Sequence, residues 1–284
     1  MKHTLGVLGG SGLYEMEGLR DVTEIDVDTP FGKPSDVLVK GTLENGTTLL
    51  FLPRHGRGHK VPPHQINYRA NVCALKMSGA THLVSVSAVG SMKEEIEPGH
   101  LVIPDQFIDL TKRRITTFFE DGVAGHVPFA DPVCALVAQA LGDAGEKIGT
   151  RVHRGGTYVC MEGPQFSTRA ESRLYRTWGV SVIGMTSMPE AKLAREAELP
   201  FATLALATDY DCWHDTHDAV TVEAVVATMK KNVSVAKRAI VLLAAALPDP
   251  TKSLAHGASR GAVMTARDAI SATARERLGW LLPN

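Results

Sequence analysis

Two carboxylates stand directly after an apolar run, in the stretch FATLALATDYDCW at residues 201–213. The apolar part is typical of a short strand buried on both faces, as in the middle of a parallel sheet. Ligands of open α/β sheets bind beyond the carboxyl ends of such strands. Asp209 and Asp211 would point the same way if the chain stayed extended, and could then face one ligand. The alternative is that Asp209 caps a loop and Asp211 is solvated.

A glycine-rich loop, GGSG at residues 9–12, follows the apolar run at residues 4–8. Glycines let the backbone approach a ligand closely, so N–H groups and the Ser11 hydroxyl could surround an anion. A dinucleotide fingerprint would need a third glycine where Glu15 stands. The loop therefore favours a phosphate over a Rossmann-type cofactor.

A basic loop, PRHGRGH at residues 53–59, follows another predicted strand. A solvated loop rarely concentrates arginines and histidines in this way. Arg54 is expected to offer a bidentate fork to phosphate oxygens, with His55 as a further donor. Hydroxyls and free N–H groups that suit an anion also stand at a strand end, Ser87-Ala88, and at a predicted helix start, Thr186.

Strands are predicted to alternate with helices along the chain, and they end near Leu8, Ser87, Met185 and Thr208. This order is typical of a largely parallel sheet with its ligand loops at one edge. Alternating residues between 22 and 53, with a turn at 44–46, add antiparallel strands. We expect an α/β fold, a single domain with a central mixed, largely parallel twisted β-sheet flanked by helices.

Helices are predicted from apolar spacing and from capping residues. Asp131-Pro132 is expected to begin one helix, and Thr168 with Glu171 to form the capping box of another. A long helix is expected over 221–247. Prolines at 248 and 250 mark a linker. The chain thus divides into a domain at residues 1–247 and a helical extension at 248–284 that could cover the site.

Other patterns predict a helix over 67–77, a strand over 156–161, one apolar segment from 101 to 110 and a loop over 111–129. Phe166, between a predicted strand and helix, is either a packing residue or a stacking wall for a planar ligand.

Composition limits the partners. The formal net charge is -1 and charged residues make up 21% of the chain, so no overall field draws it to nucleic acid or to an anionic membrane. We see neither a signal peptide nor a run long enough to span a bilayer, and expect a cytoplasmic protein. The four cysteines lack metal-binding or disulfide spacing.

Two hydrolytic readings are not supported. Asp211, His214, His217 and Asp218 fit no standard metal spacing, so no metal is expected. The sequence GGSGL lacks the last glycine of a serine-hydrolase nucleophile elbow. Anion-binding loops, an aromatic residue and two acids suit a reaction in which phosphate itself attacks a nucleoside.

The motifs GGSGLYE, VDTPFGKPSD, RHGRGH, EGPQFSTRAE, VIGMTSMPEA and ATDYDCW, taken in order, resemble the methylthioadenosine phosphorylases of the trimeric purine nucleoside phosphorylase family. The resemblance covers residues 5–247. It implies that phosphate attacks C1′ of methylthioadenosine while the purine leaves with help at N7. Inorganic phosphate would be a co-substrate and no cofactor would be needed.

The resemblance also implies roles for individual residues. Phosphate would be held by Ser11, Arg54, His55, Ser87, Ala88 and Thr186. Asp209 would protonate N7, Asp211 would accept from the 6-amino group, and the rest of the nucleoside would meet Met185, Phe166, Ser167, Val222, Val225 and Val226. His126 would reach the site of a neighbouring subunit in a homotrimer. Gly184 departs from the asparagine of some members, which leaves the ribose contacts open.

Two other functions stay open. One is a phosphorylase of 6-oxopurine nucleosides or methylthioinosine on the same frame, although a carboxylate at Asp211 would repel a 6-oxo group. The other is a nucleoside-binding protein without turnover, which would bind methylthioadenosine and phosphate but release no adenine.

Overall fold

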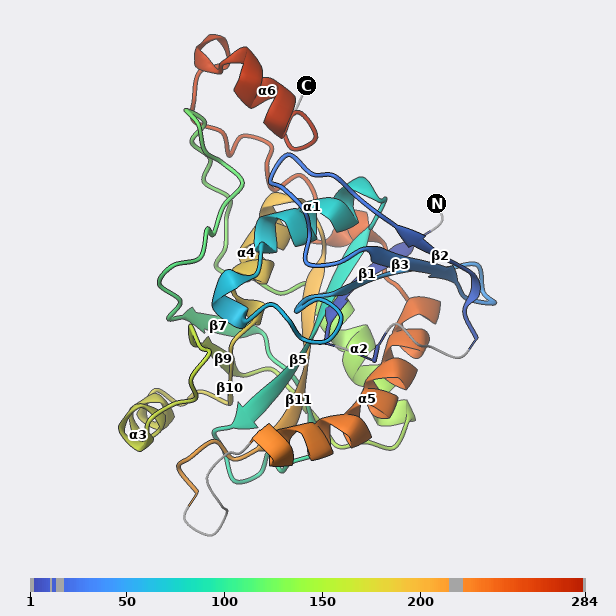
Figure 1. Cartoon of the computed structure of the whole chain (residues 1–284), viewed down its shortest axis with the longest axis vertical. Helices are drawn as coiled ribbons and strands as arrows, with labels where there is room; N and C mark the ends of the chain where they lie inside the picture. Colours follow the sequence, from blue (N-terminus) through green and yellow to red (C-terminus); the bar gives the residue numbers. More distant parts are fainter. Residues whose placement is uncertain (1–2, 11, 14–17, 215–221, 283–284) are drawn as a thin grey trace.

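A twisted mixed sheet runs through the middle of the computed structural model (Figure 1). The structure describes residues 3–10, 12–13, 18–214 and 222–282, without the side chains of 222–227 and 229–231. The strands are β1 (Thr4–Gly9), β2 (Arg20–Ile25), β3 (Leu38–Thr42), β4 (Thr48–Pro53), β5 (His82–Ser91), β6 (Leu101–Ile103), β7 (Gln106–Asp109), β8 (Val152–Arg154), β9 (Thr157–Cys160), β10 (Val182–Gly184) and β11 (Phe201–Asp209).

The centre of the sheet is parallel. β1 lies between β4 and β5, and β11 runs along the other edge of β5. β3 pairs antiparallel with both β2 and β4, as the alternating pattern predicted. β11 is buried along its length up to Thr208, because helices cover both faces of the sheet. The α/β fold with a mixed, largely parallel sheet is confirmed.

β10 departs from the expected arrangement, because it pairs antiparallel with the far end of β5, at Gly90 and Ser91. β1 pairs with the same edge of β5 only as far as Ser85. The stretch of β5 from Val86 to Val89 therefore has neither β1 nor β10 beside it in the described sheet. In the described sheet, this edge of β5 is therefore unpaired over that stretch, and the pairing resumes with β10.

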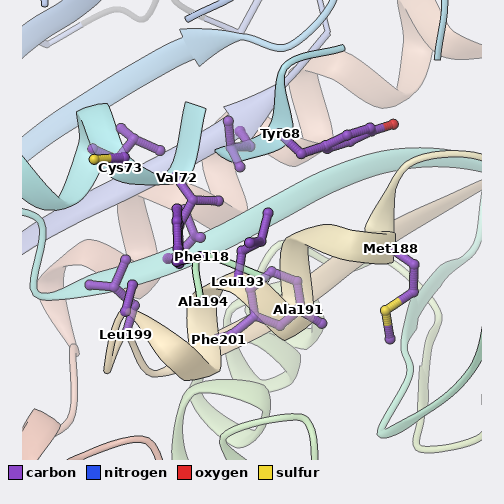
Figure 2. Packing of buried hydrophobic residues seen from close by; sticks show 14 of the residues in the cluster. Tyr68, Val72, Cys73, Phe118, Met188, Ala191, Leu193, Ala194, Leu199 and Phe201 are labelled. Carbon is purple, nitrogen blue, oxygen red and sulfur yellow. The ribbon is translucent and has the colours of Figure 1, made fainter. Parts of the chain in front are cut away.

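The described chain has six α-helices: α1 (Tyr68–Met77), α2 (Ala135–Lys147), α3 (Arg169–Thr177), α4 (Ser187–Glu196), α5 (Val222–Ala245) and α6 (Ala272–Leu278). Side chains of α1 and α4 belong to the core on one face, and those of α2 and α5 to the core on the other. Figure 2 shows Val72 of α1 above Leu193 and Ala194 of α4, within the first core. α3 and α6 lie at the periphery (Figure 1).

Predicted helix starts were confirmed where the side chain of the capping residue forms a hydrogen bond with the first turn of the helix. Thr168 and Glu171 form the predicted capping box of α3. Asn67 caps α1 by accepting from the N–H of Ala70. The long helix expected over 221–247 is α5, and no regular element occupies 111–129.

One predicted boundary was wrong, and the sequence did not resolve three of the strands. α2 begins at Ala135, not at Asp131-Pro132, because the N–H of Cys134 donates to the carbonyl of Phe201 and ties the chain to β11 first. The apolar segment 101–110 is two strands, β6 and β7, separated at Pro104, which cannot donate to a ladder. β8 is too short to give a pattern in the sequence.

The C-terminal extension packs on its own chain. Ile270, Ala274, Leu278 and Leu281 belong to the same core as α1 and α4. The ring of Trp280 meets Phe118 edge to face at 5.0 Å. In the described part of the chain, no helix has the length and apolar character required to cross a membrane.

Candidate active site

A cavity of about 780 Å³ lies where β5 loses its neighbour. Its wall combines the ends of β5 and β11, the loop after β4 and the turns around β10. Nine of the predicted site residues line it: Arg54, His55, Ser87, Ala88, Phe166, Met185, Thr186, Asp209 and Asp211. Among these nine, Arg54 and Asp211 are the furthest apart in the sequence, at 157 positions.

Ser87 and Thr186 meet because β10 runs antiparallel to β5. The two hydroxyl oxygens are 3.0 Å apart, and the Tyr158 hydroxyl lies 3.2 Å from Ser87 Oγ. All three side chains are buried. Gly184 belongs to the same arrangement, since a Cβ built there would collide with the Tyr158 hydroxyl. The departure at Gly184 noted in the sequence therefore makes room for Tyr158.

Arg54 lines the cavity, but the predicted bidentate fork is not free. Its Nε and Nη2 donate to the carboxylate of Glu190, and Nη2 also contacts Ser85 Oγ at 2.8 Å and Leu8 O at 3.1 Å. Nη1 donates to Val86 O at 3.1 Å. A guanidinium has five N–H groups, so one on Nη1 is left for a ligand. Arg54 holds the wall together and can offer a single donor.

Glu190 is fully buried in the first turn of α4, and its carboxylate compensates the Arg54 charge. Burial opposes the charged form of Arg54, but the attraction of Glu190 prevails and raises the pKa of the guanidinium. Glu190 was not predicted as a site residue from the sequence. Its available signal was an acid directly after Pro189 in the first turn of a predicted helix.

His55 is a neutral side chain in this pocket, not a charged donor. Burial, reinforced by the Arg54 charge, lowers its pKa from 6.5 to about 3. Nδ1 lies 2.8 Å from Val61 O, and a carbonyl only accepts, so the proton is on Nδ1. Nε2 is then an acceptor. The His59 ring stacks on His55 with centroids 4.1 Å apart and also lines the cavity.

Asp209 ends β11 and also lines the cavity. Its Oδ2 accepts from Thr208 Oγ1 at 2.6 Å, and its Oδ1 accepts from the N–H of Asp211 at 2.8 Å. Burial raises the pKa of Asp209, and the neighbouring Asp211 raises it further. The missing side chain of Gly90 leaves room for both acids, since a Cβ there would lie 3.0 Å from Asp209 Oδ1.

Asp211 reaches the cavity by a different backbone path from the one predicted. The chain does not stay extended, because Asp211 has a φ of 51° and its N–H turns back onto Asp209. Asp211 is 7% exposed, and burial raises its pKa. Asp and Asn tolerate this left-handed conformation better than most residues. Both acids face one cavity, as expected, through a turn instead of an extended pair.

Phe166 lines the cavity and is 45% exposed, so it is not simply a core residue. Ser167 lies next to it without lining the cavity, and its hydroxyl points to Met161 Sδ at 3.6 Å. The Ser167 carbonyl accepts from the Cys212 thiol at 3.3 Å. This contact joins the loop of Phe166 to the loop of Asp211.

Of the five other predicted residues, the structure describes the side chain of His126 alone. His126 is exposed and does not line it, and its N–H donates to Ala262 O. Ser11 lies outside the described residues. So do His217 and Asp218 of the metal-like spacing. Three valines lie on α5 near its start, where the structure describes no side chains: Val222, Val225 and Val226.

Several residues in the wall carried no signal in the sequence. Apolar side chains, Leu13, Val86, Ile183, Leu206 and Val233, surround part of the cavity. Lys60 also lines it, one residue beyond the basic loop. The cavity thus combines polar groups with apolar side chains, a half-exposed aromatic ring, one buried acid and one partly buried acid. This combination can hold a planar, partly apolar ligand next to an oxyanion.

Known proteins match this chain along most of its length. The family model described as the phosphorylase superfamily matches residues 4–245. An S-methyl-5′-thioadenosine phosphorylase of Geobacter sulfurreducens is 56% identical over 99% of both chains. One from Thermosynechococcus vestitus is 50% identical, also over 99% of both chains.

Solved structures agree. The crystal structure of a methylthioadenosine phosphorylase from an antarctic soil metagenomic library is 48% identical, with a TM-score of 0.93 over 99% of both chains. The methylthioadenosine phosphorylase of Schistosoma mansoni in complex with adenine is 35% identical, with a TM-score of 0.88, covering 93% of this chain and all of that one. This chain therefore belongs to the phosphorylase superfamily, and within it to the family of the S-methyl-5′-thioadenosine phosphorylases.

Proposed function

We propose that this chain cleaves 5′-methylthioadenosine with inorganic phosphate, giving adenine and 5-methylthioribose-1-phosphate. As a member of its family the chain is an enzyme, a pentosyltransferase. The observation that carries the proposal is that Asp209, a partly buried acid with a raised pKa, lines the same cavity as the hydroxyls of Ser87 and Thr186. The acid serves the leaving purine, and the hydroxyls serve the attacking phosphate.

Phosphate is the co-substrate, and the reaction needs no cofactor. Its oxygens would accept from Ser11, from the free Nη1 hydrogen of Arg54, and from Ser87, Ala88 and Thr186. His55 would accept from the phosphate O–H, because its Nε2 carries no proton. The Arg54 charge is already compensated by Glu190, so the corner would bind phosphate mainly through oriented donors.

Phosphate would attack C1′ as the bond from C1′ to the purine breaks and positive charge develops on the ribose. Asp209 would give its proton to N7, so that adenine leaves as a neutral base. Asp211 would accept from the 6-amino group, Phe166 and Ser167 would flank the purine, and Met185 would contact the ribose. The raised pKa of Asp209 is what general-acid catalysis near neutral pH requires.

The 5′-methylthio group would meet Val222, Val225 and Val226 at the start of α5, where an apolar wall disfavours a hydroxyl. His126 would complete the site of a neighbouring subunit in a homotrimer. Its exposure on the loop before α2 supports this role, since it is available to another chain. We place the enzyme in the cytoplasm, acting on a small nucleoside without nucleic acid or membrane.

An adenine-release assay tests this function. Methylthioadenosine, adenosine and inosine are each supplied with and without phosphate, and bases and sugars are identified. We expect release of adenine from methylthioadenosine only with phosphate, together with the sugar phosphate. Cleavage of inosine but not methylthioadenosine would indicate the 6-oxopurine alternative, and binding without release would indicate a binding protein.

Mixing two inactive variants tests the subunit arrangement. His126→Ala damages the donated residue, and Asp209→Asn damages the site that receives it. Mixed trimers would contain some sites with neither defect, so activity should return on subunit exchange. Mixtures that stay as inactive as their components would contradict the role of His126.

A further inference from the structure

Arg114 is a buried arginine that does not line the cavity and that the proposed reaction does not use. It lies in the irregular segment between β7 and α2, and its side chain is 1% exposed. Burying a guanidinium is costly unless every donor finds an acceptor. Its five N–H groups have six acceptors within reach, all within the protein.

One set of acceptors belongs to the turn after β10. Nη1 donates to Met185 O at 2.6 Å and to Met188 O at 2.5 Å. These two carbonyls bracket Thr186, whose hydroxyl faces Ser87 in the cavity. Arg114 therefore fixes both ends of the turn that presents Thr186.

A second set belongs to the loop after β9. Nη2 donates to Glu162 O at 2.7 Å and to Met161 O at 3.4 Å, and Nε donates to Glu162 Oε1 at 3.2 Å. Met161 lines the cavity, and the same loop continues to Phe166. Arg114 thus also fixes the base of the loop that carries the aromatic wall.

The Glu162 carboxylate clamps Arg114 in place. Its Oε2 accepts from the backbone N–H groups of Lys112 and Arg113, next to Arg114 itself. Burial acts against the ionised form, but these bonds and the Arg114 charge hold the pKa of Glu162 below its usual value. The pair is therefore charged at neutral pH, and the guanidinium has one defined orientation.

A third wall is reached through Tyr68. Nη1 lies 2.8 Å from the Tyr68 hydroxyl, which donates to Pro63 O at 2.9 Å, and Pro63 lines the cavity. The guanidinium also lies over the Tyr68 ring, 5.0 Å from its centroid.

We propose that Arg114 is a positioning residue that sets the distance between the Thr186 turn and the Phe166 loop, so that the phosphate and purine subsites form together. This inference deepens the proposed function and rests on it for its kinetic consequences. A lysine could not replace Arg114, because its ammonium has three donors at one point instead of a planar fork.

The test compares Arg114→Lys with a matched control, Arg195→Lys. Arg195 is also buried, at 4% exposure, and also donates to two carbonyls, those of Pro128 and Asp131. Neither carbonyl belongs to the cavity wall. Both variants keep the positive charge, and both are expected to lower the melting temperature.

Hydrogen exchange is measured over the two segments 161–167 and 185–188. We expect exchange to become faster in both segments of Arg114→Lys and in neither segment of Arg195→Lys. Faster exchange in one segment alone, in neither, or equally in the control would overturn the proposal. This readout needs no substrate, so it decides the role of Arg114 even if the wild-type protein shows no phosphate-dependent adenine release.

Kinetics of the same variants give the functional readout. In Arg114→Lys we expect KM for methylthioadenosine and KM for phosphate to rise together, each by roughly tenfold, as for the loss of a buried charged hydrogen bond. Arg195→Lys should not raise the two KM values together, because its carbonyl partners lie outside the cavity wall. A rise in only one KM would contradict a shared positioning role, whereas an inactive wild type would contradict the proposed function instead.

Discussion

The two sides of the cavity differ in how their ionisable groups are paired and protonated. On the phosphate side, Arg54 is paired with Glu190 and His55 is held neutral by burial. On the purine side, Asp209 and Asp211 lie close together, and burial raises the pKa of each. On the phosphate side the charged groups pair with each other and stabilise the wall. On the purine side the two acids have raised pKa values and bind protons more readily.

This difference assigns different work to the two sides. On the phosphate side, the Arg54 charge is balanced by Glu190, and oriented hydroxyls and N–H groups can bind phosphate. Such binding still lets the sugar phosphate dissociate after the reaction. Burial shifts the equilibrium of an acid towards its protonated form, which is the form that can donate to a leaving base. Substitutions on the phosphate side should therefore mainly lower the free energy of unfolding, and substitutions on the purine side should mainly change the reaction rate or the specificity.

Glu190→Gln should give the largest effect on folding. It leaves the buried Arg54 guanidinium without its charge partner, which typically costs about 3–5 kcal/mol of unfolding free energy. Urea denaturation of the wild type and the variant measures this loss. A variant within about 0.5 kcal/mol of wild type would show that the pair does not hold the phosphate wall together.

Asp209→Asn should give the largest effect on catalysis. The amide keeps the shape of the side chain but cannot supply the proton, so we expect kcat to fall about 10²- to 10⁴-fold. Steady-state adenine release measures it. Folding should not suffer: the acid's pKa is raised in the folded state, so stability is fully present below its ordinary value of 3.8 and falls as pH rises above it. The variant should therefore equal or exceed the wild type in stability at pH 7.

Asp211→Asn should change specificity more than rate. An amide can donate to a 6-oxo group, which a carboxylate repels, so the preference for methylthioadenosine over methylthioinosine should shrink about 10- to 100-fold. The ratio of the two kcat/KM values gives the answer. An unchanged ratio would mean that another group recognises the 6-position.

Acid should weaken the phosphate side through His55. Its folded pKa of about 3 lies below its ordinary 6.5, so the unfolded chain takes up a proton that the folded chain refuses. Stability is fully present above 6.5 and is lost as pH falls towards 3. Denaturation midpoints at pH 7 and pH 5 should therefore differ less in His55→Asn than in the wild type. An equal difference in both proteins would show that His55 is not the titrating group.

The sequence predicted most of the strands and nine of the residues that line the cavity, because buried strands and caps leave local patterns. It did not predict the reversal of β10, since pairing direction is set by partners far away in the chain. That reversal is what places Thr186 against Ser87.

The sequence also did not predict which side chains pair with each other over long distances in the chain. Arg54 and Glu190 are 136 residues apart, so nothing local indicates that the fork is already occupied. Arg114 stood in a stretch without periodicity, where an arginine gives no sign of being buried. Asp211 was placed correctly in the cavity for an incorrect reason, because a left-handed residue at the end of a strand cannot be inferred from spacing alone.

The pH dependence of kcat for methylthioadenosine, at saturating phosphate, tests the role of Asp209 most directly. The wild type and Asp209→Asn are compared, and the ratio of their rates removes the titration of phosphate itself. We predict that the wild-type advantage is greatest at low pH and shrinks as pH rises through the raised pKa of Asp209. A ratio that stays constant with pH, or a variant as active as the wild type, would contradict protonation of the purine by Asp209.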